Sequence, residues 1–495
     1  MENILRQIVE QRRARLAQMG PELGAKVPAE RTVPVVKFGR SPFVITEIKR
    51  SSPSRGKIDS IFDPVKQARM YQKAGIRTVS ILTEEEHFSG SLDDLLAVKS
   101  AIPALALLRK DFLLSLADIE VSYRAGADAV LLIARILEKE QLEGLYRRTL
   151  ELGMTPLVEL HSSTDLRKAE RLQPAFVGIN SRDLSTFRVD PAHPIKLKGL
   201  MSWPAAVVYE SGIRGRESAM LPGRSGFAGI LVGETAVREP AQIPELIRGF
   251  ETGRAKHTGC PAEDRPRSGY FWSDLFRRQP GGGPYVKICG LTRTEDVRAA
   301  DAAGADLLGF ILAEVSPRAT TAEFIRSLGA TRALKVAVVL GTESPVMPAV
   351  RQLLQDGELD AVQFHGSEAP EACAAAAYPY YKALPLREMA DIDRVGDYHC
   401  PRVLVDAYHQ GQSGGTGKRI DGALVQAAAE RAPLWLAGGL NPDNIAEVVQ
   451  QYRPELLDAS SGLETAPGIK DSELIARFIH NVRTANQAAE MELTL

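Results

Sequence analysis

Residues 126–134 read GADAVLLIA, and residues 304–312 read GADLLGFIL. In both stretches a Gly-Ala-Asp turn leads into a short, continuous apolar run. Runs of this kind, bounded by turn residues, are typical of strands buried on both faces, as in a parallel sheet covered by helices. The return of the same phrase in the second half of the chain indicates a repeated architecture.

Similar apolar runs alternate with amphipathic helical patterns along the whole chain. In the first half they occupy residues 43–48, 78–82, 104–108, 129–134, 156–160, 176–180, 206–210 and 229–233. In the second half they occupy residues 285–290, 307–312, 334–340, 361–366, 380–384, 402–407, 434–439 and 456–462. Eight strands alternating with helices fit a closed barrel. The predicted fold class is therefore α/β, with two tandem (β/α)8 TIM barrels joined by a linker.

A stretch rich in Pro and Gly separates the two sets of runs. It contains GCPAEDRPRSG and QPGGGP, in which Pro and Gly oppose both helix and strand. We therefore predict one barrel in residues 1–250, a linker in residues 251–284 and a second barrel in residues 285–495. The aromatic middle of the linker, YFWSDLFRRQ, is interpreted as a short segment packed on a barrel surface or, alternatively, as a partner-binding helix.

Composition excludes several classes of protein. The 495 residues exceed one ordinary core, and 44% apolar with 25% charged residues is typical of a globular chain. The 61 Lys and Arg nearly balance the 62 Asp and Glu, so no overall field attracts nucleic acid or an anionic membrane. The first twenty residues predict an amphipathic helix rather than a signal peptide. The four cysteines form no CxxC pair, which favours a reducing cytoplasm over a disulfide framework or a zinc site.

Charged residues follow the apolar runs of the first half. In a parallel barrel the carboxyl ends of the strands face one shared mouth, so these residues are candidates for function. Glu47 and Lys49 lie two residues apart and share a strand face, and Lys110, Glu159 and Glu210 lie at or just after the ends of later runs. Each alone would be interpreted as a solvated rim charge. Together they suit acid–base chemistry better than core stability.

Six motifs carry a family resemblance: EIKRSSPS, LRKDF, VELH, GINSRDL, ESGI and LVGE. They resemble, in order, the strand-end motifs of indole-3-glycerol-phosphate synthases of tryptophan biosynthesis. That family closes the indole ring of carboxyphenylamino-deoxyribulose phosphate with loss of carbon dioxide and water. The resemblance implies that Lys110 is the general acid at the substrate ketone and that Lys49, near the substrate carboxylate, shares this role. Because a neighbouring cation lowers a lysine pKa, each is expected to release a proton readily. Arg109 has no role that the sequence assigns.

The resemblance implies further roles in the first half. Glu159 is expected to act in the dehydration, Glu47 and Glu210 to stabilise the iminium charge or accept protons, and Asn180 to orient them. The substrate and its phosphate are expected to contact Ser52, Phe112, Arg182, Ser211, Gly212 and Gly233. The glycines have an alternative interpretation as ordinary turn residues.

The second half begins with Lys287-Ile288-Cys289-Gly290, which puts a thiol at the end of its first strand. The motifs SPR, QFHG, VDAYHQGQSGGTGK, AGGLNPDN and DASSGLE follow, and together they are similar to those of phosphoribosylanthranilate isomerases. The resemblance implies an Amadori rearrangement, with Asp406 as the acid at the ring oxygen and Cys289 as the base at C2 of the sugar. The acid needs a raised pKa, whereas cations that lower the pKa of the thiol would favour the base.

Other residues of the second half receive roles from the same resemblance. Arg318 is expected to bind the anthranilate carboxylate through its planar fork, and His365 to contact the substrate or, alternatively, to be a structural histidine. Residues 414–418 are interpreted as a flexible loop near the mouth. The phosphate is expected to contact Gly438, Gly439, Ser461 and Gly462.

Neither a metal nor another cofactor is predicted. His399, Cys400 and His409 could suggest a metal site, but adjacent strand residues point to opposite faces. The expected partners are small-molecule, anthranilate-derived sugar phosphates, without nucleic acid or membrane, and the chain is expected to be monomeric and cytoplasmic. Two alternatives are another aldose–ketose isomerase, which Arg318 and the pair Cys289 and Asp406 disfavour, and a noncatalytic sugar-phosphate sensor, which would have lost acid and base residues.

Overall fold

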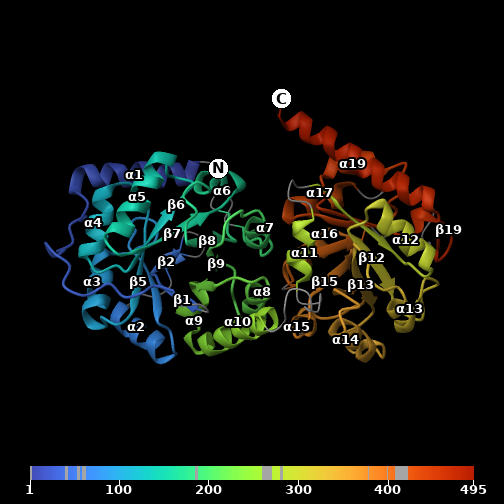
Figure 1. Cartoon of the computed structure of the whole chain (residues 1–495), viewed down its shortest axis with the longest axis horizontal. Helices are drawn as coiled ribbons and strands as arrows, with labels where there is room; N and C mark the ends of the chain where they lie inside the picture. Colours follow the sequence, from blue (N-terminus) through green and yellow to red (C-terminus); the bar gives the residue numbers. More distant parts are fainter. Residues whose placement is uncertain are drawn as a thin grey trace. The chain divides into compact units, whose positions relative to one another are not determined.

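The computed structural model describes residues 3–39, 43–52, 56–57, 63–183, 188–258, 270–278, 283–376, 378–398, 400–406 and 422–494. The chain divides into two compact units, residues 1–259 and 260–495. In each unit, strands form a closed parallel barrel enclosed by helices (Figure 1). The predicted fold class of two tandem (β/α)8 barrels is confirmed.

The first barrel closes when its first strand pairs with its last. Its strands, in spatial order, are β1 (Phe43–Ile48), β4 (Thr78–Leu82), β5 (Ala106–Lys110), β6 (Ala129–Ile133), β7 (Thr155–Leu160), β8 (Phe176–Asn180), β9 (Ala206–Glu210) and β10 (Gly229–Val232). The third strand begins two residues later than predicted, because Leu105 closes a turn onto Ile102 after Pro103. That shift places Lys110 inside the strand, as its last residue.

Helices and one small sheet complete the first unit. The sheet consists of β2 (Ser51–Ser52) and β3 (Gly56–Lys57). The helices are α1 (Asn3–Met19), α2 (Pro64–Lys73), α3 (Leu92–Ala101), α4 (Leu116–Arg124), α5 (Lys139–Glu151), α6 (Ser163–Ala169), α7 (His193–Gly199), α8 (Arg216–Arg224), α9 (Glu234–Arg238), η1 (Pro240–Gln242) and α10 (Ile243–Thr258).

The second barrel has the same strand order and closes between β11 and β18. Its strands are β11 (Tyr285–Cys289), β12 (Leu307–Ile311), β13 (Leu334–Val339), β14 (Ala361–Phe364), β15 (Tyr380–Pro385), β16 (Val403–Asp406), β17 (Trp435–Ala437) and β18 (Leu456–Ala459). A hairpin of β19 (Glu464–Ala466) and β20 (Ile469–Lys470) follows. The helices are α11 (Phe271–Arg277), α12 (Thr294–Ala303), α13 (Ala322–Ser327), α14 (Met347–Gln355), α15 (Pro370–Ala374), α16 (Met389–Asp393), η3 (Arg394–Gly396), α17 (Gly422–Arg431), α18 (Ile445–Tyr452), η4 (Ser461–Leu463) and α19 (Ser472–Thr494).

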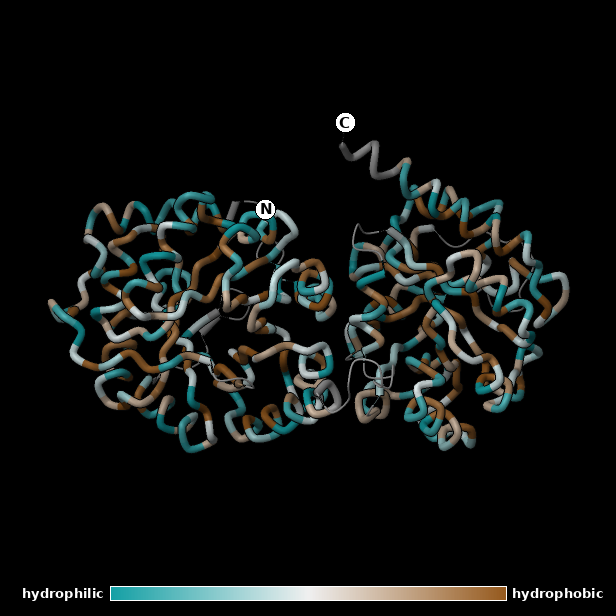
Figure 2. The backbone as a smooth tube through the Cα atoms, viewed as in Figure 1, coloured by the Kyte–Doolittle hydropathy of each residue, from teal (hydrophilic) through white to brown (hydrophobic). Residues whose placement is uncertain are grey.

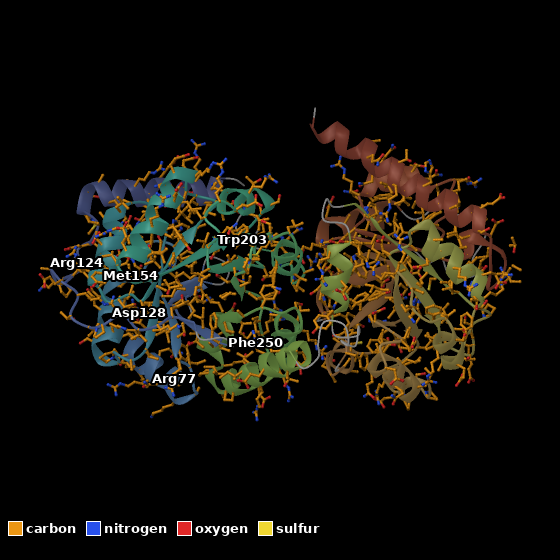
Figure 3. The ribbon with its side chains drawn as sticks, in the orientation of Figure 1. Arg77, Arg124, Asp128, Met154, Trp203 and Phe250 are labelled. Atoms are coloured by element: carbon orange, nitrogen blue, oxygen red, sulfur yellow. The ribbon has the colours of Figure 1, made fainter. Side chains whose placement is uncertain are left out.

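The Asp of the repeated Gly-Ala-Asp phrase makes the same two backbone hydrogen bonds in both barrels. Asp128, labelled in Figure 3, accepts a hydrogen bond from Leu107 N at 2.8 Å, and its own N–H donates to Leu107 O at 2.8 Å. Asp306 makes the same pair of 2.8 Å bonds with Val286. Each carboxylate therefore satisfies a backbone N–H near the start of the preceding strand, and each forms an ion pair, Asp128 with Arg31 and Lys99 and Asp306 with Arg483.

The central strands are largely hydrophobic, as their colour in Figure 2 shows. At the amino end of the first barrel the rings of Phe38, Phe43 and Phe176 pack together, with centroids 6.2 to 6.4 Å apart. Burial of such strands on both faces is the main force that closes a parallel barrel. None of the helices in the described residues is long and apolar enough to span a membrane.

The aromatic segment predicted within the linker forms α11 and packs on the second barrel. Trp272 is 6% exposed and lies 5.7 Å, between ring centroids, from Trp435 at the start of β17. Phe276 lies 6.1 Å from Tyr285 at the start of β11. Because both partners begin their strands, α11 covers the amino end of this barrel. The interpretation as a segment packed on a barrel surface is confirmed.

Candidate active sites

Five charged side chains of the first barrel gather at the carboxyl ends of its strands. Lys110 Nζ lies 3.3 Å from Glu47 Oε2 and 3.4 Å from Glu210 Oε2. Lys49 Nζ lies 3.2 Å from Glu47 Oε1. The carboxylate of Glu159 is close enough to act electrostatically on both Lys110 and Glu210. The structure therefore brings the predicted lysines and glutamates together around one mouth.

The pKa expected for Lys110 is wrong in direction. Burial alone would lower the pKa of this amine, but the carboxylates of Glu47, Glu210 and Glu159 outweigh it and raise the pKa above its usual value. The ammonium of Lys49 forms an ion pair with Glu47, and it is not among the main influences on the pKa of Lys110. Lys110 is therefore held as an ammonium whose proton is stabilised by the carboxyl groups around it.

The three carboxyls of this site differ in their ionisation. Burial raises the pKa of Glu210 well above its usual value, and the neighbouring Glu159 carboxylate raises it further. For Glu159, burial also disfavours the anion, but His161 and Lys110 outweigh it and lower the pKa to about 2. The two lysines likewise outweigh burial at Glu47 and lower its pKa. The site thus favours the anionic forms of Glu47 and Glu159 and the protonated form of Glu210.

His161 is a functional candidate that sequence reasoning missed, although it ends the motif VELH. Its Nε2 lies 2.5 Å from Glu159 Oε1, and both side chains are almost fully buried. The backbone N–H of His161 donates to Asp165 Oδ2 at 2.9 Å, and Ser162 caps the helix α6 that follows. The capped turn after β7 therefore holds the imidazole against the carboxylate. Glu159 Oε2 and Glu210 Oε1 are buried without a partner from the rest of the described residues, and a hydrogen bond joins the two carboxyl groups.

A buried network fixes the strand end that carries Lys110. Asp111 accepts hydrogen bonds from Thr83 Oγ1 at 2.6 Å and from Arg109 Nη2 at 2.9 Å. Arg12 on α1 lies 3.3 Å from Asp111 and 3.2 Å from Asp118. Alternation along β5 turns Arg109 outward into this network and Lys110 inward to the mouth. The network assigns Arg109 the structural role that the sequence did not reveal.

The other candidates of the first barrel follow the carboxyl ends of its strands along the chain. Asn180 pairs in register with Glu210, and its Oδ1 accepts from the N–H of Arg182 at 3.0 Å. Phe112 is 8% exposed and its ring packs 6.5 Å from that of Phe88, which forms an apolar wall. Ser52 lies in β2, and its side chain falls outside the described residues.

Backbone geometry at two loops suits close approach by a ligand. Ser211 and Gly212, directly after β9, have φ values of 68° and 76°, in the left-handed region that a non-glycine residue rarely adopts. At Gly233 a Cβ would lie 2.7 Å from Glu47 Oε1 and 2.9 Å from Lys49 Nζ. The glycine therefore leaves room for charged side chains of the site, which ordinary turn geometry would not require.

In the second barrel the candidate base and acid end β11 and β16. Cys289 is 7% exposed, and Lys287 Nζ lies 3.4 Å from its Sγ. Burial raises the pKa of the thiol, and the cations of Lys287 and Lys470 only partly oppose it. The expected positive surroundings are present, but a net lowering of the pKa is wrong because burial is stronger. Burial also raises the pKa of Asp406, to about 6, as an acid at neutral pH requires.

His365 and Arg318 lie at the same mouth. His365 Nε2 is 3.7 Å from Asp406 Oδ2, and 39% of its side chain is exposed. Arg318 makes a bidentate pair with Glu464, with both Nε–Oε1 and Nη2–Oε2 at 2.8 Å. Lys470 Nζ lies 2.7 Å from the same carboxylate. The predicted carboxylate-binding arginine is therefore already held by a carboxylate of the chain, which the sequence did not indicate.

The predicted phosphate contacts lie on neighbouring loops after β17 and β18. Gly438 and Gly439 have φ values of 100° and 65°, and a Cβ on Gly439 would meet no atom within 4 Å. Ser461 and Gly462 begin η4, where a Cβ on Gly462 would lie 2.2 Å from Leu440 O. The close approach brings the two loops together. Residues 407–421, including the predicted loop at 414–418 and His409, and also His399, lie outside the described residues.

Among the residues that the structure describes, no group of three or more His, Cys, Asp and Glu side chains could hold a metal ion. Buried side chains of both mouths are instead paired with one another.

Comparison with known proteins matches each barrel to a family. A family model described as indole-3-glycerol phosphate synthase matches residues 4–246. One described as N-(5'phosphoribosyl)anthranilate (PRA) isomerase matches residues 286–481. A solved structure of phosphoribosyl anthranilate isomerase from Thermotoga maritima is 31% identical, with a TM-score of 0.37, over 41% of this chain and 99% of that one.

Relatives of known function span one or both halves. The tryptophan biosynthesis protein TRP1 of Phytophthora nicotianae is 30% identical over 89% of this chain and 91% of its own length. The indole-3-glycerol phosphate synthase of Exiguobacterium sibiricum is 36% identical over 50% of this chain and 98% of its own. The multifunctional tryptophan biosynthesis protein of Schizosaccharomyces pombe is 30% identical over 89% of this chain, which spans 59% of that protein's length. The chain therefore belongs to the fused enzymes of tryptophan biosynthesis, with an indole-3-glycerol phosphate synthase domain followed by a phosphoribosylanthranilate isomerase domain.

Proposed function

We propose that the chain catalyses two consecutive steps of tryptophan biosynthesis. The second barrel converts N-(5'-phosphoribosyl)anthranilate to 1-(2-carboxyphenylamino)-1-deoxyribulose 5-phosphate. The first barrel closes that product to indole-3-glycerol phosphate, with loss of carbon dioxide and water. The order of the two domains along the chain is the reverse of the order of the two steps.

One observation carries the proposal: each barrel gathers its own acid and base groups at a single mouth. In the first barrel Lys110 lies within 3.4 Å of two carboxylates that come from different strands. In the second, Lys287 lies 3.4 Å from Cys289 and acts electrostatically on Asp406. Burial of charged groups costs free energy, so we expect clusters of buried lysine and carboxyl side chains where they take part in a reaction.

For ring closure, Lys110 is the group that donates a proton to the ketone oxygen as the ring carbon attacks it. The anions around Lys110 keep it protonated until then. The oxygen becomes strongly basic as the new bond forms, so the transfer is favourable in spite of the raised pKa. Lys49 binds the substrate carboxylate and can share the acid role.

Loss of water needs one group that gives a proton and one that takes a proton. Neutral Glu210 suits the donor, and the Glu159 anion beside it suits the acceptor. Glu47, as an anion, would stabilise the iminium charge. Asn180, in register with Glu210, would orient that carboxyl.

For the isomerisation, Asp406 protonates the ring oxygen and Cys289 removes the proton from C2. A carboxyl with a pKa of about 6 keeps a useful fraction of its proton near neutral pH. Arg318 binds the anthranilate carboxylate, and His365 contacts the substrate beside Asp406. The ionised thiol is stabilised by the cations around it, which partly offset burial.

Phosphate would lie on backbone N–H groups at the loops after the last two strands of each barrel. In the first barrel the contacts on these loops are Ser211, Gly212 and Gly233, joined by Arg182 after β8 and Ser52 from β2, and Phe112 packs on the aromatic ring of the substrate. In the second they are Gly438, Gly439, Ser461 and Gly462. Positive φ at four of these positions supports close approach of an anion to the backbone.

We infer further that the chain works as a cytoplasmic monomer on small sugar phosphates, without nucleic acid. Each candidate site is built from the strands of one barrel, so a second copy is not needed to complete it. The nearly balanced charge supports small substrates over nucleic acid.

The test is incubation of the purified chain with N-(5'-phosphoribosyl)anthranilate, with the aminoketose and indole-3-glycerol phosphate followed by chromatography. Both should appear in that order. Lys110→Ala should stop the chemistry at the aminoketose, whereas Cys289→Ala should prevent its formation but still convert added aminoketose. Conversion of neither substrate by the wild-type chain would refute the proposal.

A further inference from the structure

A fully buried lysine links the residues of the second site. Lys287 lies on β11 two residues before Cys289 and therefore on the same, interior face. Its Nζ lies 2.6 Å from Asp458 Oδ2, 2.6 Å from Gln363 Oε1 and 3.4 Å from Cys289 Sγ. An ammonium has three N–H donors, so these three acceptors use all of them. The side chain of Lys287 is 0% exposed, so it is held in place from every side.

The contacts of Gln363 fix which end of its amide faces which neighbour. Its Oε1 receives the N–H of Lys287, which can only donate, and the hydroxyl of Tyr381 at 3.0 Å. The amide nitrogen must then be the atom that faces His365 Nδ1, at 2.9 Å. An amide nitrogen donates, so Nδ1 of His365 is an acceptor. The orientation follows from the lysine and needs no assumption about the histidine.

The tautomer of His365 follows from this acceptor. If Nδ1 accepts, the proton of the neutral imidazole is on Nε2, which faces Asp406 Oδ2 at 3.7 Å. Desolvation, with the cations of Lys287 and Lys382, lowers the pKa of His365 to about 4, which keeps the ring neutral. A continuous row of contacts thus runs from Cys289 through Lys287, Gln363 and His365 to Asp406.

We propose that Lys287 is a positioning residue for the isomerisation: its ammonium stabilises the thiolate of Cys289 and, through Gln363, turns the N–H of His365 toward Asp406. This inference rests on the proposed roles of Cys289 as base and Asp406 as acid. Lys287 does not contact the substrate in this scheme. It acts on Cys289 and Asp406 from its buried position inside the barrel.

The charge of Lys287 is the part of this scheme that can be measured. Several charged or titratable groups act on the thiol from the elements around it: Lys287, Asp458, Lys470, Arg318 and Tyr381. Among the effects that lower the pKa of Cys289, that of Lys287 is the largest, and Asp458 opposes it. Removal of the lysine and removal of the aspartate should therefore change the pKa of the thiol in opposite directions.

The experiment compares Lys287→Met and Asp458→Asn in the full chain. The thiolate of Cys289 is titrated by its ultraviolet absorbance, with the same variant carrying Cys289→Ser as the blank. Lys287→Met should raise the pKa of the thiol by at least about 1, whereas Asp458→Asn should lower it. The isomerase kcat/KM of Lys287→Met at pH 7 should fall at least about 10-fold, because a thiol whose pKa is higher by about 1 has about 10-fold less thiolate at neutral pH.

Lys335→Met is the matched control. Lys335 is also buried, at 2% exposure, and is paired with Glu358, but it has no contact with Cys289 among the described residues. This variant should keep the wild-type thiol titration and isomerase pH profile. The synthase activity of the first barrel should stay within about 2-fold in every variant, which verifies that the protein purified is active.

Three results would overturn the inference. The first is a thiol titration in Lys287→Met that matches the wild type. The second is a rise of the thiol pKa in Asp458→Asn, the same direction as that expected for Lys287→Met. The third is an equal pKa change in Lys335→Met. Failure of the proposed function itself would look different, since the wild type would then not isomerise its substrate or Cys289→Ser would retain full activity. If Lys287→Met does not fold, the sign of the pKa change in Asp458→Asn alone decides.

Discussion

The imidazole of His161 lies 2.5 Å from the carboxylate of Glu159, and it is the largest favourable influence on the Glu159 anion. His161→Leu should therefore raise the pKa of Glu159 and weaken its role in the dehydration. We expect the synthase kcat to fall about 100-fold and the acidic limb of its pH profile to move to higher pH. His480→Leu, on the exposed face of α19, is the control. An unchanged acidic limb in His161→Leu would contradict the assignment.

A Cβ added at Gly178 would lie 2.0 Å from Glu210 Oε1, inside the first barrel. Gly178→Ala should displace that carboxyl from Lys110. A displacement of about 1 Å at a reacting group can reduce the rate about 100-fold, and we expect a synthase loss of that size with the isomerase intact. Gly144→Ala on α5 meets no atom within 4 Å and should be neutral or stabilising. Equal activity of the two variants would argue that Glu210 is not held by this contact.

Arg12 is the cation by which α1 reaches the buried carboxylates of Asp111 and Asp118. Arg12→Leu leaves these anions with fewer partners and should destabilise the first barrel by about 3 kcal/mol. Denaturant unfolding followed by Trp203 fluorescence, with Trp272 and Trp435 replaced by Phe, measures the change. Arg13→Leu, at the exposed neighbouring position, should alter the free energy of unfolding by less than about 0.5 kcal/mol. Similar losses in both variants would mean that the buried pairs are not what anchors α1.

The pKa of Asp406 is raised from 3.8 to about 6 in the folded barrel. Between these pH values the folded state binds a proton that the unfolded state has lost, so stability falls as pH rises through this window. A pKa difference of this size corresponds to about 3 kcal/mol, which partial exposure of the side chain reduces to about 2 kcal/mol. Asp406→Asn should therefore stabilise the second barrel at pH 8 by about 2 kcal/mol and have little effect near pH 4.

The measurement for Asp406→Asn is denaturant unfolding at both pH values in a Trp203→Phe background, where Trp272 and Trp435 of the second barrel report. The same variant should lose isomerase activity. A stabilisation that is equal at pH 4 and pH 8 would show that the effect does not come from ionisation of the carboxyl.

Trp272 of α11 packs against Trp435 at the amino end of the second barrel. Trp272→Ala should open a cavity and destabilise this barrel by about 3 to 5 kcal/mol, while the first barrel unfolds as before. Arg277→Ala, at an exposed position of the same helix, should cost less than about 0.5 kcal/mol. If Trp272→Ala is also neutral, the contact of α11 with the barrel does not contribute to its stability.

The strands could be predicted because their signal is local. A strand buried on both faces is a continuous apolar run, and each such run of the sequence corresponds to a strand of one of the barrels. The mouth residues were predictable for the same reason, since Lys110 and Glu210 end their strands and parallel strands share one carboxyl end. A boundary such as that of β5 was less predictable because a turn at Pro103 moved it by two residues.

What the sequence did not reveal depends on partners that are distant along the chain. Arg109 acquires its role from Asp111 and from Arg12, nearly 100 residues earlier. The direction of the Lys110 pKa could not be judged without knowing that three carboxyl groups surround it. Lys287 lies within an apolar run, and only the closed barrel brings Asp458 and Gln363 to its ammonium. The local sequence pattern predicts which way a side chain points, whereas its protonation state depends on the other side chains that surround it in the fold.

The bidentate contact between Arg318 and Glu464 has a consequence for recognition at the second site. The guanidinium plane is fixed by the fold before any ligand arrives, so a carboxylate that approaches its free edge meets an oriented fork rather than a mobile side chain. Less rotational entropy is then lost on complex formation, and selectivity shifts toward ligands whose acid group lies in that plane. A planar aromatic acid meets this demand, while a flexible aliphatic acid must first give up its own torsional freedom.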